Sequence, residues 1–257
     1  MTAEPRPAAL ALFPDDVATQ LEADTREVIA RYPDSRSALL PLLHLIQSVD
    51  SFVSPRGIAW CAEALDLSRA EVSAVATFYS QYKRKPNGRY TVGVCTNTLC
   101  AVMGGDEIFG AVSEHLGIGN EETTSDGAIT LEAVECNAAC DYAPVVMVNW
   151  EFFDNVTPAS AISLVDDLQA GREVTASRGP VVQDFRAVSR VLAGFEDGLV
   201  DSGPTAGPAS LVGLEIAREH GWRAPAYPGA PEADPTAGTE AVGEPGSSAD
   251  HQEGTQS

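Results

Sequence analysis

Two pairs of cysteines, each placed directly after a predicted β-strand, constrain the fold of this chain more than any other feature. The first pair lies in CTNTLC at 95–100 and the second in ECNAAC at 135–140. The pattern is C-x4-C, then 35 residues, then C-x3-C. The preceding stretches, RYTVGVC and AITLEAVEC, have the alternation and β-branched content of strands. If these strands are neighbours in a sheet, four thiolates converge at one of its edges.

The residue types and their spacing leave several kinds of site open. Soft thiolate ligands bind iron–sulfur clusters, zinc or cuprous copper. Four cysteines satisfy a 2Fe-2S cluster with one pair on each iron. Structural zinc more often uses C-x2-C on both sides, and a dithiol redox centre uses C-x-x-C at a helix N-terminus. Neither spacing occurs here. The pattern therefore favours a 2Fe-2S cluster over zinc and over unliganded or redox-active thiols, which stay open as alternatives.

Charge and cysteine count narrow the classes of function. The 257-residue chain has 16 Lys and Arg against 37 Asp and Glu, a net charge of -21. A phosphate backbone would repel such a chain, so no nucleic-acid partner is expected. Five cysteines, an odd number, do not suit a disulfide scaffold. The cysteines are therefore better explained as metal ligands.

The sequence does not have the character of a membrane span or a targeting segment. No stretch approaches 18 apolar residues. MTAEPRPAALALFPDD reads as neither a secretory signal nor a transit peptide, because its apolar run is short and interrupted by proline and acid. We therefore expect a cytoplasmic chain without direct membrane insertion, in a compartment that keeps thiols reduced.

Residues 14–85 have the pattern of a helical bundle, after a flexible N-terminus at 1–13. DDVATQLEADTREVIARY spaces its apolar residues along one helix face. Ser54 followed by Pro55 is a helix start, and SRAE at 68–71 is a capping box. Four short helices are predicted, with turns at 32–36, 50–54 and 65–68.

The pattern changes after the turn signal KRKPNG at 83–88. Residues 88–172 then show the order β-α-β-β-β-α, in which the last two strands form an antiparallel hairpin. A right-handed crossover makes the first strand pair parallel. The prediction is an α/β chain with a helical bundle followed by a thioredoxin-like domain. Its predicted segments are 89–95, 106–118, 128–136, 145–150, 151–156 and 158–171.

The C-terminal part is predicted to be an extension and a tail. The extension at 173–200 contains one short helical segment, FRAVSRVLAGFED. From 201 to 257 there are 7 Pro, 9 Gly, 9 acidic and 2 basic residues. Such a composition buries too little apolar surface to offset chain entropy, so a disordered acidic tail is predicted. LVGLEIAREHGW at 211–222 is the amphipathic piece within it that is able to dock as a helix.

The chain resembles the thioredoxin-like 2Fe-2S subunit of bacterial NADH–quinone oxidoreductase, the respiratory complex I. The resemblance spans roughly residues 12–195. It rests on SALLPLLHLIQ, FVSPRGIAWCAEALDLSRAEVSAVATFYSQY, YTVGVCTNTLC and ETTSDGAITLEAVECNAACDYAPVVMVNWEFFDNVTP, with SRGP at 177–180 as a further candidate stretch. Two features depart from the family pattern: the hairpin turn has Asn149-Trp150 instead of Asn-Asp or Asn-Gly, and the tail after about 200 exceeds the usual length.

The resemblance implies a cofactor and its ligands. One 2Fe-2S cluster would be held by Cys95, Cys100, Cys136 and Cys140. Asp141 would then help to keep the reduction potential low, and the hydroxyls of Thr96 and Thr98 are candidate donors to sulfur. Cys61 and His44, which lie in apolar helical segments, are expected to belong to the core.

The resemblance also implies a role and partners. The chain would be part of an oxidoreductase and would exchange one electron with FMN, with no catalytic residue of its own. FMN and NADH would bind to a neighbouring flavoprotein subunit, since this chain has no dinucleotide-binding or Walker motif. The larger iron–sulfur subunit would be a second partner, and the location would be the inner face of the bacterial cell membrane.

Two alternatives remain at the sequence level. The same family includes the equivalent diaphorase subunit of NAD-linked hydrogenases and formate dehydrogenases. A structural zinc-binding interaction module is an alternative from another class.

Overall fold

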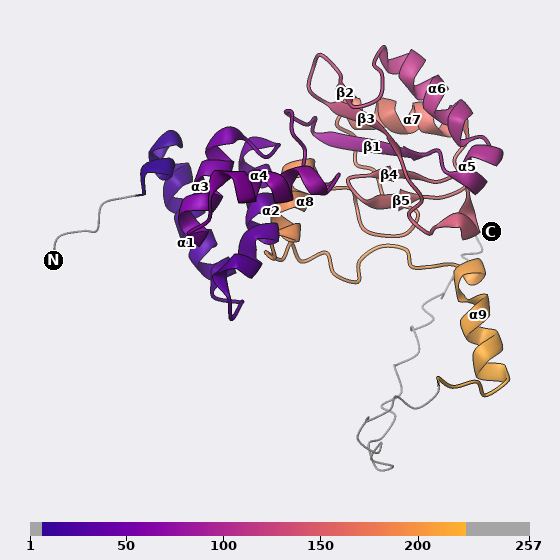
Figure 1. Ribbon diagram of the computed structural model, residues 1–257. Helices are drawn as coiled ribbons and strands as arrows, with labels where there is room; N and C mark the ends of the chain where they lie inside the picture. Colours follow the sequence, from indigo (N-terminus) through magenta and orange to yellow (C-terminus); the bar gives the residue numbers. More distant parts are fainter. Residues whose placement is uncertain (1–6, 225–257) are drawn as a thin grey trace, which may run out of the picture. The chain divides into compact units, whose positions relative to one another are not determined.

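The computed structural model describes residues 7–224 and begins with a helical bundle (Figure 1). The four predicted helices are present, together with two short 3-10 helices. The bounds are η1 Ala8–Leu12, α1 Asp15–Ile29, η2 Ser35–Ala38, α2 Leu39–Asp50, α3 Pro55–Leu65 and α4 Arg69–Phe78. The predicted turns therefore separate the helices where local sequence signals placed them.

Side-chain caps explain where two of these helices begin. The Ser54 hydroxyl accepts a hydrogen bond from the Gly57 amide, and Pro55 occupies the first position of α3. Ser68 and Glu71 form the predicted capping box of α4. Each cap satisfies backbone N–H groups that have no partner inside the helix. Pro41 lies in the first turn of α2, where its missing N–H costs no helical hydrogen bond.

The bundle core is built by close helix contacts. The α2–α3 crossing depends on Gly57, where a Cβ atom would lie 2.2 Å from the Ile46 Cγ2 atom. The Trp60 indole donates a hydrogen bond of 3.2 Å to the Thr25 hydroxyl, which joins α3 to α1. Cys61 is fully buried in this core, and so is almost all of His44, as predicted.

The second half of the chain forms a five-stranded sheet of order β2-β3-β1-β4-β5. β1 and β3 are parallel, and β4 and β5 continue the sheet antiparallel, as predicted. The short helix α5 and strand β2 were not predicted. The bounds are β1 Tyr90–Cys95, α5 Thr98–Val102, α6 Gly105–Leu116, β2 Glu122–Thr123, β3 Ile129–Val134, η3 Cys140–Tyr142, β4 Val146–Val148, β5 Glu151–Phe153 and α7 Pro158–Gln169.

The two faces of the sheet have different surroundings. Helices α6 and α7 pack against each other, with α6 contacting β1 and α7 contacting β3 (Figure 1). Their core includes inward-facing residues of three strands: Val92, Val94, Ile129, Leu131, Val146 and Val148. On the other face a groove of about 820 Å³ is lined by Thr91, Gly93 and Glu132 of the sheet and by the segment that links α4 to β1.

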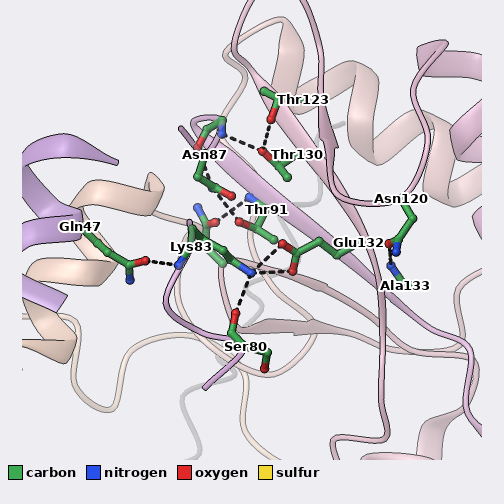
Figure 2. A network of polar contacts seen from close by, with 12 residues as sticks. Gln47, Ser80, Lys83, Asn87, Thr91, Asn120, Thr123, Thr130, Glu132 and Ala133 are labelled. Carbon is green, nitrogen blue, oxygen red and sulfur yellow. Dashed lines mark hydrogen bonds and ion pairs between the residues drawn. The ribbon is translucent and has the colours of Figure 1, made fainter. Parts of the chain in front are cut away.

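A polar network ties that linking segment to both the bundle and the sheet (Figure 2). The Lys83 amide donates to Gln47 of α2 over 2.6 Å. The Lys83 ammonium group donates to both carboxylate oxygens of Glu132 on β3, at 2.6 and 2.8 Å. Asn87 then bonds the Thr91 hydroxyl, and Thr130 accepts from the Gly88 amide. Lys83 therefore bridges the bundle and the sheet.

The hairpin turn between β4 and β5 is formed by Asn149 and Trp150, the pair that departs from the family pattern. Asn149 and Trp150 both have positive φ angles, 48° and 74°. The Asn149 side chain accepts from the Thr91 amide and donates to the carbonyls of Arg89 and Gln183. The Trp150 ring stacks on Phe185 at a centroid distance of 5.8 Å. The turn is thus fixed by side-chain contacts with other parts of the chain.

The C-terminal extension returns to the bundle. Its predicted helix forms as α8, Phe185–Leu192, and packs against α2. Arg190 of α8 pairs with the buried Asp24 of α1 over 2.6 Å. Bundle, sheet and extension belong to one compact unit that ends at Leu211, and a second unit begins at Val212.

Part of the predicted tail is helical. Helix α9, Pro208–Glu219, forms inside the stretch predicted to be disordered from residue 201, around its amphipathic piece. Pro208 opens this helix, the position at which proline favours helix formation. The rest of the predicted disordered tail, 225–257, and residues 1–6 of the predicted flexible N-terminus lie outside the described residues. Within the described part, no helix combines the length and apolarity needed to cross a bilayer.

Candidate metal centre

The sheet brings the two cysteine loops to the same edge. Cys95 is the last residue of β1 and lies opposite Val134, the last residue of β3. The Thr96 amide donates to the Val134 carbonyl over 3.3 Å, so the chains leave the sheet side by side. Cys136 follows two residues after Val134. The parallel pairing predicted from the β-α-β order therefore places both loops together.

The first loop is shaped by a small helix and a glycine. Cys100 lies on α5 and is buried, as is Cys95. A Cβ atom at Gly105 would lie 2.4 Å from the Cys95 carbonyl oxygen and 2.9 Å from that of Cys100. Only glycine allows α6 to begin this close to both cysteines.

The second loop presents its two sulfur atoms next to each other. The Cys136 and Cys140 Sγ atoms are 3.4 Å apart, and Cys136 is exposed. The Ala138 amide donates to the Cys136 sulfur over 3.3 Å, with Ala138 at a φ of 56°. The small residues between these cysteines thus let a backbone N–H approach the Cys136 sulfur.

One side-chain contact joins the two loops directly. The Asn97 amide group donates to the Glu135 carboxylate over 2.5 Å. This pair was not predicted from the sequence, because 38 residues separate its members. The hydroxyl of Thr98, a candidate donor to sulfur, donates to the Asn97 side chain over 3.3 Å.

Neighbouring thiols raise one another's pKa values at this site. Burial, together with the neighbouring Cys100 and Cys136, raises the pKa of the Cys95 thiol to about 11, although the Asn97 amide acts in the opposite direction. The Cys136 contact raises the pKa of Cys140. Thiolate ligands must lose these protons, so metal binding here releases protons. Cys61 lies apart in the bundle, where burial raises its pKa to about 12.

The donors present fit a 2Fe-2S cluster. All four are free cysteines arranged as two pairs on two loops, and each pair suits one iron. Among residues 7–224, no three His, Cys, Asp or Glu side chains are grouped as a site for a single metal ion, whereas a 2Fe-2S cluster takes only two thiolates per iron. Amides of Asn97 and Ala138 directed at sulfur are the donors that stabilise cluster sulfur atoms.

The surroundings of the second loop include several unpredicted contacts. Asp141 lies 3.6 Å from the Arg178 guanidinium group and accepts a hydrogen bond from the Ser210 hydroxyl. Its negative charge, expected to act on the site, is therefore partly offset. The Ala143–Pro144 peptide bond, whose state the sequence left undecided, is cis.

Comparison with known proteins assigns the family. The family of thioredoxin-like 2Fe-2S ferredoxins matches residues 25–169, more than half of the chain. The chain belongs to this family. The match includes both cysteine loops and all of the sheet, and it begins within helix α1.

Several bacterial relatives match over longer stretches. A subunit of the NADH-quinone oxidoreductase of Mycobacterium tuberculosis is 58% identical over 221 residues, which is 86% of this chain and 88% of the relative. The corresponding protein of Mycobacterium bovis has the same values. NADH-quinone oxidoreductase subunit 2 of Thermus thermophilus is 36% identical over 151 residues, 58% of this chain and 83% of the relative.

The mycobacterial matches bear on the tail. A match over 221 residues reaches at least residue 221, so it includes the segment that contacts Asp141 and Tyr142. Residues 201–221 therefore fall largely within the stretch aligned with these relatives, although they lie beyond the usual length of the family.

Proposed function

We propose that this chain is the electron-transfer subunit of an NADH–quinone oxidoreductase. It holds one 2Fe-2S cluster on Cys95, Cys100, Cys136 and Cys140. The observation that carries the proposal is the convergence of four free thiols on two adjacent loops, in a chain 58% identical over 86% of its length to a mycobacterial NADH-quinone oxidoreductase subunit.

The cluster supplies one-electron redox chemistry, and the protein supplies its environment. Cys95 and Cys100 hold one side from buried positions, whereas Cys136 and Cys140 hold the other near the surface. Backbone N–H groups directed at sulfur stabilise negative charge there. The adjacent, partly neutralised Asp141 disfavours additional negative charge, which lowers the reduction potential.

The electron partner in this proposal is a flavoprotein subunit that binds FMN and NADH. The surface beside Cys100 suits a protein partner, because Leu99 and Val102 of α5 and the following Met103 are exposed by 43%, 82% and 53%. The larger iron–sulfur subunit of the same complex is the second proposed partner. The complex would lie at the cytoplasmic face of the bacterial membrane.

Purification of the full chain with iron and sulfide tests the cofactor. We expect about two irons and two sulfides per chain and a paramagnetic signal after one-electron reduction. Cys136→Ser should lose the cluster, whereas the control Cys61→Ser should keep it. A colourless wild-type chain with one zinc ion would refute the cluster, and loss in the Cys61 variant would refute the ligand set.

Affinity purification from cells tests the complex. The tagged chain should co-purify with a subunit that contains FMN and oxidises NADH, and with quinone-reducing subunits. Co-purification with hydrogenase or formate dehydrogenase subunits instead would overturn the respiratory assignment while keeping the electron-transfer role.

A further inference from the structure

The second cysteine loop makes few contacts of its own. Residues 135–138 are exposed. Within the loop, Asn137 bonds the Glu135 carbonyl, Ala138 bonds the Cys136 sulfur, and the Cys136 and Cys140 sulfur atoms are in contact; outside it, Glu135 accepts from Asn97. Beyond Cys140, the Tyr142 amide donates to the Ala139 carbonyl over 3.2 Å. Besides the buried Ala139 and Ala143, the position of Cys140 therefore depends on what surrounds residues 141 and 142.

Arg178 of the extension provides the first outside contact. Its guanidinium carbon lies 5.4 Å from the Tyr142 ring centroid and 5.1 Å from that of Phe152. The same group pairs with Asp154 at 2.7 Å and with Asp141 at 3.6 Å. The Arg178 side chain is only 17% exposed, so these interactions are weakly screened. Arg178 thus anchors the two residues that follow Cys140 to the β5 strand end.

Residues 203–210 provide the second outside contact. The Ala209 amide donates to the Tyr142 hydroxyl over 3.1 Å, and the Ser210 hydroxyl donates to Asp141. At the start of the segment, the Pro204 carbonyl accepts a hydrogen bond of 2.9 Å from the amide of Gly179, the residue after Arg178. The segment therefore contacts both the cysteine loop and the residue next to Arg178.

Two glycines make this path sterically possible. A Cβ atom at Gly207 would lie 2.3 Å from the Tyr142 hydroxyl oxygen. One at Gly203, where φ is 80°, would lie 1.9 Å from the Gly179 carbonyl oxygen. Larger residues at either position would push the segment away from the loop.

We propose that Arg178 and the segment 203–210 form a brace that positions Cys140 for cluster binding. Arg178 is then a positioning residue that acts on the cluster through Asp141 and Tyr142. The proposal rests on the proposed function, because it assumes that Cys140 is a cluster ligand. The brace slows cluster loss, and its positive charge makes the reduction potential less negative.

Cluster loss to an iron chelator tests the brace in the full chain. The double variant Tyr142→Phe/Ser210→Ala removes two hydrogen bonds and should lose the cluster about tenfold faster, the ratio that corresponds to about 1.4 kcal/mol. Arg172→Gln is the matched control, since Arg172 forms an exposed pair with Asp167 and should leave the rate unchanged. Wild-type loss rates in the double variant and in Arg178→Gln would overturn the proposal.

The reduction potential separates positioning from mere structural support. Arg178→Gln should shift the potential to more negative values because a cation near the cluster is lost. Arg178→Lys should restore the potential but still lose the cluster faster, because lysine keeps the charge and not the forked contacts. Equal potentials in all three proteins would refute the electrostatic part of the proposal.

Amide exchange in the metal-free chain tests the brace without the cluster. The Tyr142 and Ala143 amides, which bond the Ala139 and Cys140 carbonyls, should exchange faster in the double variant than in the wild type. Unchanged exchange would overturn the brace. A wild-type chain that binds no iron would refute the proposed function, and the exchange result would still decide on the brace.

Discussion

Lys83→Met should weaken the attachment of the helical bundle to the sheet. The Lys83 and Glu132 side chains are only 14% and 17% exposed, and the pair is doubly hydrogen-bonded (Figure 2). The Lys83 ammonium group also donates to the Ser80 carbonyl over 3.3 Å. Met preserves the apolar stem of Lys83 but leaves the Glu132 carboxylate without its cation.

The expected loss of unfolding free energy in Lys83→Met follows from how deeply the Lys83 and Glu132 side chains are buried. Exposed ion pairs contribute about 0–1 kcal/mol, whereas removing one partner of a buried pair costs about 3–5 kcal/mol. With both side chains mostly but not fully buried, an intermediate loss of about 2 kcal/mol is expected for Lys83→Met. For a compact unit of this size, that corresponds to a Tm lowered by roughly 4–8 °C.

A double-mutant cycle measures the pair itself. Denaturant unfolding of wild type, Lys83→Met, Glu132→Gln and the double variant should give a coupling free energy of about 1–2 kcal/mol. The control is Glu22→Gln, which breaks an exposed pair with Arg26 and should change stability by less than about 0.5 kcal/mol. Coupling below about 0.3 kcal/mol, or coupling abolished by moderate salt, would show that the pair behaves as a surface contact and refute the reasoning.

Two further predictions address the cysteine loop and the bundle core. Gly105→Ala should destabilise the first cysteine loop by about 2 kcal/mol or more and impair cluster retention, because its Cβ atom meets two carbonyl oxygens. The control Gly110→Ala, with open space around its Cβ position, should stabilise α6 by about 0.5–1 kcal/mol in the same unfolding assay. Burial lowers the pKa of His44 from 6.5 to about 4, so neutral His44 favours the folded state at pH above 6.5. As pH falls from 6.5 to 4, wild type should lose about 3 kcal/mol more stability than His44→Gln, measured by denaturant unfolding at each pH. Parallel pH profiles for the two proteins would contradict this.

Local signals in the sequence predicted much of the fold. The caps at Ser54 and Ser68 and the alternation in 89–95 depend on residues a few positions apart, and each formed as predicted. The β-α-β order predicted the parallel pairing of β1 and β3, because a right-handed crossover permits few alternatives. Both candidate cysteine loops therefore came to one edge of the sheet, as expected.

Contacts between distant segments were not predictable in the same way. The pattern of FRAVSRVLAGFED indicated a short helix but did not indicate that the helix would pack on α2. The Arg190–Asp24 pair joins residues 166 positions apart, and Arg178 reaches Asp154 across 24 positions. The average composition of 201–257 is that of a disordered segment. It does not reveal the contacts with Asp141 and Tyr142, because these involve only a few residues of the segment.

The chain after residue 172 serves two separable purposes, because α8 packs on the bundle, whereas Arg178 and residues 203–210 contact the cysteine loop. Phe185 of α8 is 1% exposed and stacks on Trp150, so Phe185→Ala should lower the unfolding free energy by about 3–5 kcal/mol. Under native conditions that variant should retain wild-type amide protection at Tyr142, because the brace residues are unchanged. Tyr142→Phe/Ser210→Ala should show the reverse, with faster exchange at Tyr142 and a loss of unfolding free energy of about 1.4 kcal/mol, well below that of Phe185→Ala. If Phe185→Ala also loosened Tyr142 in the folded protein, α8 and the brace would be coupled, and the brace would depend on the docking of α8.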